Sequence, residues 1–194
     1  SSDVCSSDLE IYPGGNQNPV TYGFGPLENV LEGKFRPGHF KGVGQVVSRL
    51  FEIVTPDKAY FGEKDFQQLA VIRDLVRQKN FPVEIVGCPT LREPDGLAMS
   101  SRNLLLTPEM RAEAATISKA LFRLRDHRNS KDLSGLKSEA IEMIEHSGKL
   151  SVEYLEVADE QTLEPVTILS PSKNYRCLAA VYAGNIRLID NVQV

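Results

Sequence analysis

Between residues 40 and 88 the sequence alternates twice between a helical pattern and a short apolar run. From about Phe40, apolar residues recur at the spacing of a one-sided helix, and the pattern ends before Pro56. An apolar run at 58–61 ends at Gly62, a second helical pattern covers about 65–79, and another apolar run covers 83–88. We interpret both runs as buried strands. Helices alternating with strands through tight connections predict a parallel α/β sheet.

The rhythm changes after Pro89, where a polar loop leads to a strong helix start. Thr107 is a suitable N-cap and Pro108 suits the first turn, so helices are expected near 108–126 and 133–147. Strands are expected at 152–158, 167–169, 176–182 and 186–190, with a tight hairpin at Gly184-Asn185 between the last two. Helices followed by strands predict a smaller α+β domain. We place the domain boundary at about residue 90.

The first 38 residues carry little periodic signal. Residues 1–9 repeat the triplet Ser-Ser-Asp and lack an initiator Met, so we interpret them as a non-native or disordered tail and expect the natural N-terminus to lie upstream. Residues 10–38 are rich in Gly, Pro and Asn. That composition predicts mostly loop with short extended pieces.

Composition restricts the classes of function. The net charge of −4 argues against a mainly nucleic-acid-binding surface. No apolar stretch approaches the roughly 18 to 20 residues that span a bilayer, so no membrane partner is expected. The three cysteines are odd in number and far apart, and with three histidines they form no zinc-site spacing. We therefore expect a cytoplasmic protein without a protein-bound metal.

The first segment that carries chemistry is the turn from Phe61 to Gln68. A glycine joins the carboxyl end of a predicted strand to a helix N-terminus, where backbone N–H groups and the helix dipole favour anions. Lys64 adds a mobile cation, and Asp65 is placed to cap the helix or to hold a ribose hydroxyl. Taken alone, these residues favour an ordinary capped helix with solvated charges.

Two further segments are candidates for anion binding. In the loop 95–103, Ser100 and Ser101 precede Arg102 and together offer neutral donors and a guanidinium fork for phosphate oxygens. Arg36 lies beside Pro and Gly on a stiff turn, which suits a positioned cation. Taken alone, a serine–arginine loop is usually only a polar connector. For His39 we favour a capping or structural role over that of a base.

These segments together resemble pantothenate synthetase. The resemblance covers nearly everything from Glu10 onward, and its matching runs occur in the family's order. The runs are Leu31–Gly33, Arg36–Phe40, Phe61–Leu69, Asp95–Asn103 and Arg187–Asn191.

The resemblance implies an incomplete Rossmann-like nucleotidyltransferase domain with a parallel sheet at residues 10–90, and a smaller α+β C-terminal lid domain at 91–194. It also implies an ATP-dependent ligase of pantothenate biosynthesis that uses Mg²⁺. In such a ligase the carboxylate of (R)-pantoate attacks the α-phosphate of ATP to form pantoyl-adenylate and pyrophosphate. The amine of β-alanine then displaces AMP to give pantothenate.

The resemblance places the site residues as well. It implies catalytic roles for Lys64, Ser100, Ser101 and Arg102. Gln68 would hydrogen-bond pantoate. Lys64 would meet phosphate and Asp65 the ribose. The implied ATP site comprises Gly62, Glu63, Lys64, Asp65, Leu91, Met99, Ser100, Ser101, Arg102 and Arg36.

One departure from the family pattern matters. The family's His-x-Gly-His signature, which contacts ATP, does not occur in this sequence. We therefore expect this chain alone to be inactive, and we expect exposed strand edges. The family also implies a homodimer. Two alternatives remain: a related adenylate-forming enzyme with another acid substrate, or a nucleotide-binding or dimerisation fragment without activity.

Overall fold

The chain folds into two compact units. The computed structural model describes residues 22–129 and 131–194, so the predicted tail at 1–9 lies outside the described residues. The first unit contains the described residues up to Phe61 together with Gln67–Gly87. The second contains Gly62–Phe66 together with Cys88–Val194.

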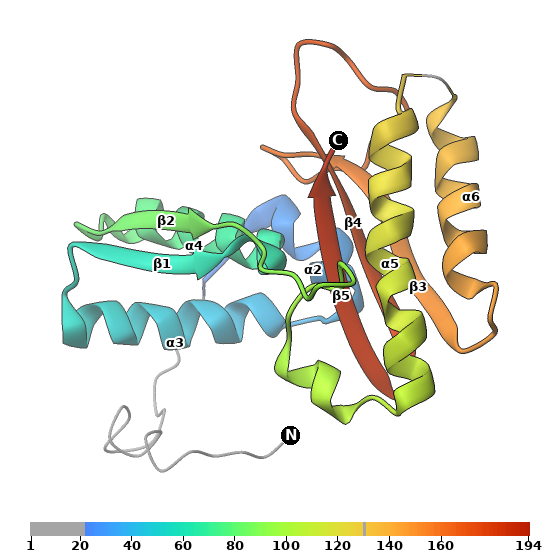
Figure 1. Cartoon of the computed structure of the whole chain (residues 1–194). Helices are drawn as coiled ribbons and strands as arrows, with labels where there is room; N and C mark the ends of the chain where they lie inside the picture. The colour runs from blue at the N-terminus through green and yellow to red at the C-terminus, as the bar shows by residue number, and fades with distance from the viewer. Residues whose placement is uncertain (1–21, 130) are drawn as a thin grey trace. The chain divides into compact units, whose positions relative to one another are not determined.

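The first unit carries the expected alternation of helices and strands. Strands β1 and β2 form a two-stranded sheet and run in the same direction (Figure 1). Phe51 of helix α3 and Ile72 of helix α4 pack with Val83 in one apolar cluster. The parallel α/β prediction is thus confirmed. The elements are α3 (His39–Val54), β1 (Lys58–Gly62), α4 (Phe66–Lys79) and β2 (Glu84–Cys88).

The prediction that both strands are buried is wrong. In β1, Lys58 and Tyr60 are exposed, whereas Ala59 and Phe61 pack against the apolar cluster. β2 is likewise only half buried. Within the described residues the sheet has two strands, so each strand has one unpaired edge and gains burial mainly on the side that meets the cluster. A run of apolar letters cannot distinguish this arrangement from full burial.

Part of the predicted loop before residue 38 is helical instead. A 3₁₀ turn η1 spans Gly25–Glu28, and a short helix α2 spans Leu31–Phe35. Gln67 supports both: its Oε1 accepts from the backbone N–H of Glu32 at 2.9 Å, and its Nε2 donates to the carbonyls of Leu27 and Val30 at 2.7 and 2.9 Å. Because the supporting side chain comes from a distant helix, local composition does not reveal the structure.

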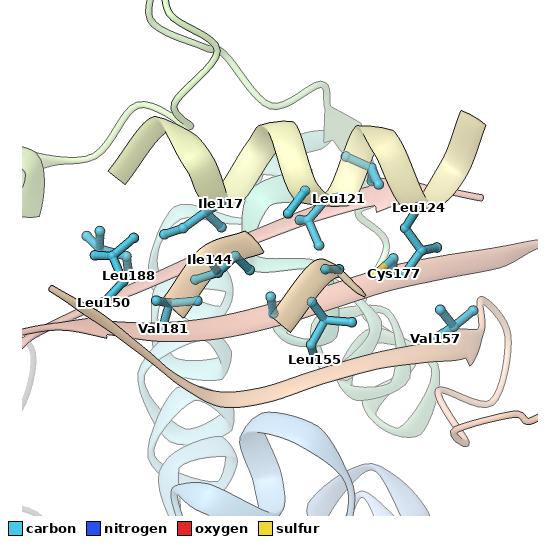
Figure 2. Packing of buried hydrophobic residues seen from close by; sticks show 14 of the residues in the cluster. Ile117, Leu121, Leu124, Ile144, Leu150, Leu155, Val157, Cys177, Val181 and Leu188 are labelled. Carbon is cyan, nitrogen blue, oxygen red and sulfur yellow. The ribbon is translucent and has the colours of Figure 1, made fainter. Parts of the chain in front are cut away.

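The second unit is the expected α+β arrangement. Strands β3, β4 and β5 form an antiparallel sheet in that order, with Leu150 opposite Ala183 and Ala183 opposite Ile186. Figure 2 shows apolar side chains of helices α5 and α6 meeting those of one sheet face in a single core. The elements are α5 (Pro108–His127), α6 (Leu133–Glu145), β3 (Leu150–Asp159), β4 (Tyr175–Ala183) and β5 (Ile186–Gln193).

Local signals explain where these elements begin and turn. Thr107 Oγ1 accepts from the backbone N–H of Met110 at 3.3 Å, and Asp132 Oδ1 accepts from that of Gly135 at 2.8 Å, so both helices have side-chain N-caps. Gly184 has a φ of 57° in the β4–β5 hairpin, a left-handed conformation that favours glycine.

Residues 167–169 do not form the predicted strand. These residues form a bend and a coil, and Ile168 is 80% exposed. Pro165 and Pro171 flank the segment, and proline cannot donate a ladder hydrogen bond. A short run between two prolines therefore offers few backbone donors for pairing with a neighbouring strand.

Candidate functional site

The turn that carries Lys64 begins at the end of β1. Gly62 has extended backbone angles and precedes a 3₁₀ turn η2 (Glu63–Asp65), which leads into α4. A Cβ atom built on Gly62 would meet no atom within 4 Å, so the backbone faces open space there. Lys64 is half-buried and Asp65 is exposed. The turn thus offers an approachable backbone beside a cation.

Lys64 contacts the serine–arginine loop directly. Its Nζ donates to the carbonyl of Met99 at 3.2 Å. Burial lowers the pKa of Lys64 below its ordinary value of 10.5, the negative charges of Asp65 and Asp190 oppose this shift, and the positive charge of Arg102 adds to it. Lys64 and Arg102 are therefore near enough for their charges to interact.

The loop itself begins as a short hairpin. Met99 N–H donates to the carbonyl of Leu91 at 2.9 Å, and Arg92 pairs with Ala98 in an antiparallel bridge. Gly96, with a φ of 94°, makes the turn. Leu91 and Met99 are both exposed, at 73% and 48% of their surface. The hairpin thus presents the backbone at Leu91 and the side chain of Met99 together.

The polar residues of the loop follow the hairpin. Ser100 caps a 3₁₀ turn η3 (Ser101–Leu105), where its Oγ accepts from the backbone N–H of Arg102 at 3.2 Å. Ser101 and Arg102 are exposed. Arg102 Nη1 donates to the carbonyl of Arg187 at 2.8 Å. Because a guanidinium has five N–H donors, this bond leaves Arg102 further donors for an anion.

The other predicted residues lie in the first unit. Arg36 follows α2, and its Nη1 lies 3.0 Å from Nε2 of His39 and 3.7 Å from a carboxylate oxygen of Glu32. Gln68 is half-buried on α4. The structure therefore brings Lys64, Leu91, Met99, Ser100 and Arg102 together within the second unit, and it places Arg36 and Gln68 in the first unit.

Sequence reasoning missed the buried polar residues beneath the turn. Asn191 is 3% exposed, and its Nδ2 donates to the carbonyls of Glu63 and Lys64 at 2.9 and 2.8 Å. The available signal was an adjacent polar pair, Asp190 and Asn191, that follows Leu188 and Ile189 at the end of the predicted strand. A buried polar pair on a strand indicates a specific partner.

A separate pocket of about 550 Å³ opens on the second unit. Among the predicted ATP-site residues, Glu63 lines it, but Lys64 and the serine–arginine loop do not. Two of its arginines form ion pairs within the protein: Arg92 with Asp190, and Arg176 with Glu160. This pocket is therefore a different feature from the contact between Lys64 and the loop.

Comparison with known proteins identifies the family. Residues 6–193 match the family described as pantoate-beta-alanine ligase. A pantothenate synthetase from Bacteroides thetaiotaomicron is 47% identical over 184 residues, which are 95% of this chain and 64% of that protein. One from Sulfurihydrogenibium is 48% identical over 187 residues, which are 95% and 65% of the two chains.

Solved structures give the same result. The crystal structure of pantothenate synthetase from Thermus thermophilus matches with a TM-score of 0.88 and 41% identity, over 95% of this chain and 66% of that one. Pantoate-beta-alanine ligase from Francisella tularensis, complexed with beta-gamma ATP and beta-alanine, matches with a TM-score of 0.72 and 34% identity, over 95% and 61%.

The fold defines an α/β protein with Rossmann-like parallel strands and a C-terminal unit that contains a small antiparallel sheet. Within that class, the chain belongs to the pantoate–β-alanine ligase family. It spans 64% of the length of the first curated relative that it matches. No helix in the described part of the chain is long and apolar enough to cross a membrane.

Proposed function

We propose that the protein containing this chain joins (R)-pantoate to β-alanine at the expense of ATP, through a pantoyl-adenylate. The observation that carries the proposal is the 3.2 Å hydrogen bond from Lys64 Nζ to Met99 O, because it holds a cation against the loop that bears Ser100, Ser101 and Arg102. A cation and a guanidinium close together suit the triphosphate of one nucleotide. Family membership supports the reaction class.

The proposed chemistry needs no protein nucleophile. A carboxylate oxygen of pantoate attacks the α-phosphorus, the bond to the bridging oxygen of the β-phosphate breaks, and pyrophosphate leaves. The amine of β-alanine then attacks the acyl carbon, AMP leaves, and the amine gives up a proton. Two bound reactants gain from proximity, while Lys64, Arg102 and the serine hydroxyls stabilise charge on the phosphates.

The remaining residues are assigned to binding. Gly62, Glu63 and Asp65 would approach the nucleotide from the turn, with Asp65 at the ribose. Leu91 would touch adenine through its backbone beside Met99, and Arg36 would lie near the triphosphate. Gln68 would hydrogen-bond pantoate, because a side-chain amide both donates and accepts.

Magnesium enters the proposal as part of the substrate MgATP. Mg²⁺ commonly keeps several waters and binds through substrate phosphates with one or two carboxylates. Within residues 22–129 and 131–194, no group of three or more His, Cys, Asp or Glu side chains is arranged to hold a metal ion. The proposal therefore assigns most of the magnesium ligands to phosphate oxygens and water.

Three further features are carried forward as proposals. They are a homodimer, a cytoplasmic location, and a division into a Rossmann-like domain up to residue 90 and a lid domain at 91–194. Size-exclusion chromatography with light scattering tests the first of these on the complete gene product that contains this chain.

The reaction is tested by exchange of labelled pyrophosphate into ATP, catalysed by the complete gene product. The proposal predicts exchange that depends on pantoate and AMP release that depends on both pantoate and β-alanine. Exchange with an amino acid but not with pantoate would instead identify a related adenylate-forming enzyme. ATP binding without exchange would identify a nucleotide-binding protein.

A further inference from the structure

The side-chain amide of Asn191 is hydrogen-bonded within the protein through both its nitrogen and its oxygen. Nδ2 donates to the carbonyls of Glu63 and Lys64, and Oδ1 accepts from Nη1 of Arg176 at 2.7 Å. A side-chain amide has two N–H donors, so both are committed to the backbone of the lysine turn. Such hydrogen bonds add little stability at the protein surface. In the interior, however, removing one partner leaves a buried polar group unsatisfied and lowers stability strongly.

Arg176 also contacts the turn that carries Lys64. It is 9% exposed, its guanidinium lies 3.9 Å from the ring centroid of Phe66, and it forms an ion pair with Glu160 at 2.8 Å. Its Nη2 also lies 3.9 Å from a carboxylate oxygen of Glu63. Arg176 therefore contacts residues on both sides of Lys64 in the sequence, and it orients Asn191 between them.

Asp190, the residue before Asn191, supports the hairpin that precedes the serine–arginine loop. Successive side chains of a strand point to opposite faces, so Asp190 and Asn191 reach different partners. Asp190 binds Arg92 through two hydrogen bonds of 2.7 and 2.9 Å. Arg92 also donates to the carbonyl of Gly96 at 3.0 Å, within the hairpin that precedes the serine–arginine loop. Two adjacent residues of β5 thus fix both the turn and the hairpin.

We propose that Asn191, oriented by Arg176, is a positioning residue that fixes the backbone of Glu63 and Lys64 so that the Lys64 ammonium is held against the serine–arginine loop. The inference rests on the proposed role of Lys64 at the nucleotide. A lysine side chain has four flexible carbons, so its ammonium is only as well placed as the backbone that carries it. Displacement of a catalytic group by about 1 Å can lower a rate on the order of 100-fold.

The first test measures hydrogen exchange in the 194-residue chain. Asn191→Asp keeps the size and the acceptor for Arg176 but removes both donors to the turn. We expect amide exchange in residues 62–66 to accelerate at least ~10-fold, as for local opening of one segment, while β3 and β4 stay protected. The matched control is Asn185→Asp, the same substitution on the exposed turn of the same sheet.

Two outcomes of that experiment overturn the inference. One is unchanged exchange in residues 62–66. The other is equal acceleration throughout β3, β4 and β5, which would make Asn191 a general structural residue. Should Asn191→Asp fail to fold, Asn191→Ala removes the same donors without placing a carboxylate against two carbonyls, and the same criteria apply to it.

The second test is a double-mutant cycle in the complete gene product, read as pantoate-dependent pyrophosphate exchange. We expect Asn191→Asp to lower kcat by about 10- to 100-fold with little change in the KM for pantoate. In a Lys64→Ala background the same change should cost less than about 3-fold, because a residue that acts through Lys64 has nothing left to position. Equal losses in both backgrounds would overturn the inference.

The cycle also separates this inference from the proposed function. If Lys64→Ala leaves the exchange rate unchanged, the proposed role of Lys64 fails, whatever Asn191 does. If Lys64→Ala slows exchange but Asn191→Asp does not, the positioning role fails and the proposed function stands.

Discussion

At the scale of single residues, the sequence indicates the exposed part of the candidate site better than the part beneath it. Lys64 and Arg102 are recognisable because each lies near a glycine or a pair of hydroxyls in a loop. The role of Asn191 is not recognisable, because it depends on contact with Lys64, 127 residues away in the sequence. Such a contact follows from strand pairing in three dimensions and leaves no local pattern.

The role proposed for Lys64 predicts a large kinetic effect. In the complete gene product, Lys64→Ala should slow adenylate formation by at least ~100-fold, because a charge-stabilising donor at the phosphoryl centre is lost. Pyrophosphate exchange measures this step. Lys119→Ala, which removes an exposed lysine on α5, should leave the rate unchanged. A near-normal rate in the Lys64 variant would show that this lysine is only a surface cation.

The surroundings of Lys64 also predict its titration. Burial and the charge of Arg102 lower its pKa from 10.5, so Lys64 should lose its proton at lower pH than a free lysine. Between the lowered pKa and 10.5 the unfolded chain binds more protons, so this group makes stability rise with pH across that window. NMR titration of the Lys64 side chain in the 194-residue chain measures the pKa directly.

A substitution tests the cause of that shift. Arg102→Ala should raise the pKa of Lys64 toward 10.5, whereas Arg123→Ala, on α5, should leave it unchanged. If the Arg102 variant titrates like the unsubstituted chain, the two charges do not interact and the proposed grouping loses its electrostatic support.

At the scale of elements, local chemistry predicts helices well and the environment of strands poorly. The helix that begins after Thr107 is predictable because its cap and first-turn proline lie in adjacent positions. The exposure of β1 is not, because apolar letters do not reveal how many strands flank it. The helix at Leu31–Phe35 also escapes prediction, since Gln67 of α4 stabilises it.

The packing of α5 predicts a stability effect. Leu121 is fully buried in the core that α5 and α6 form with the sheet (Figure 2). Leu121→Ala should lower the free energy of unfolding by about 2–5 kcal/mol, through lost apolar burial and the cavity left behind. Chemical denaturation of the 194-residue chain measures this difference.

The matched control uses an exposed apolar residue of the same unit. Ile168→Ala should change the free energy of unfolding by no more than about 0.5 kcal/mol, because Ile168 is 80% exposed. Equal losses at Leu121 and Ile168 would contradict the packing described for the second unit.

At the scale of the whole molecule, family membership is predictable from five short runs in the right order. Each run alone is compatible with an ordinary loop or helix start. All five runs lie within residues 6–193, which match the family. The relatives are longer, since the chain spans 64% of the Bacteroides thetaiotaomicron protein. Activity therefore has to be judged on the complete gene product.

The 194-residue chain itself should release no measurable AMP from ATP with pantoate and β-alanine. The His-x-Gly-His signature that the resemblance leads us to expect at the ATP site does not occur in this sequence. A coupled AMP assay with the complete gene product as positive control tests this expectation. Sustained AMP release from the 194-residue chain that depends on both substrates would contradict it.

The most direct test is a crystal structure of the complete gene product with a non-hydrolysable ATP analogue. The decisive quantities are the distances from Lys64 Nζ and from the Arg102 guanidinium to phosphate oxygens. We predict that both groups lie within hydrogen-bonding reach, about 2.7–3.2 Å, of one nucleotide. A nucleotide bound elsewhere, or one touched by only one of these two groups, would contradict the adenylation site proposed here.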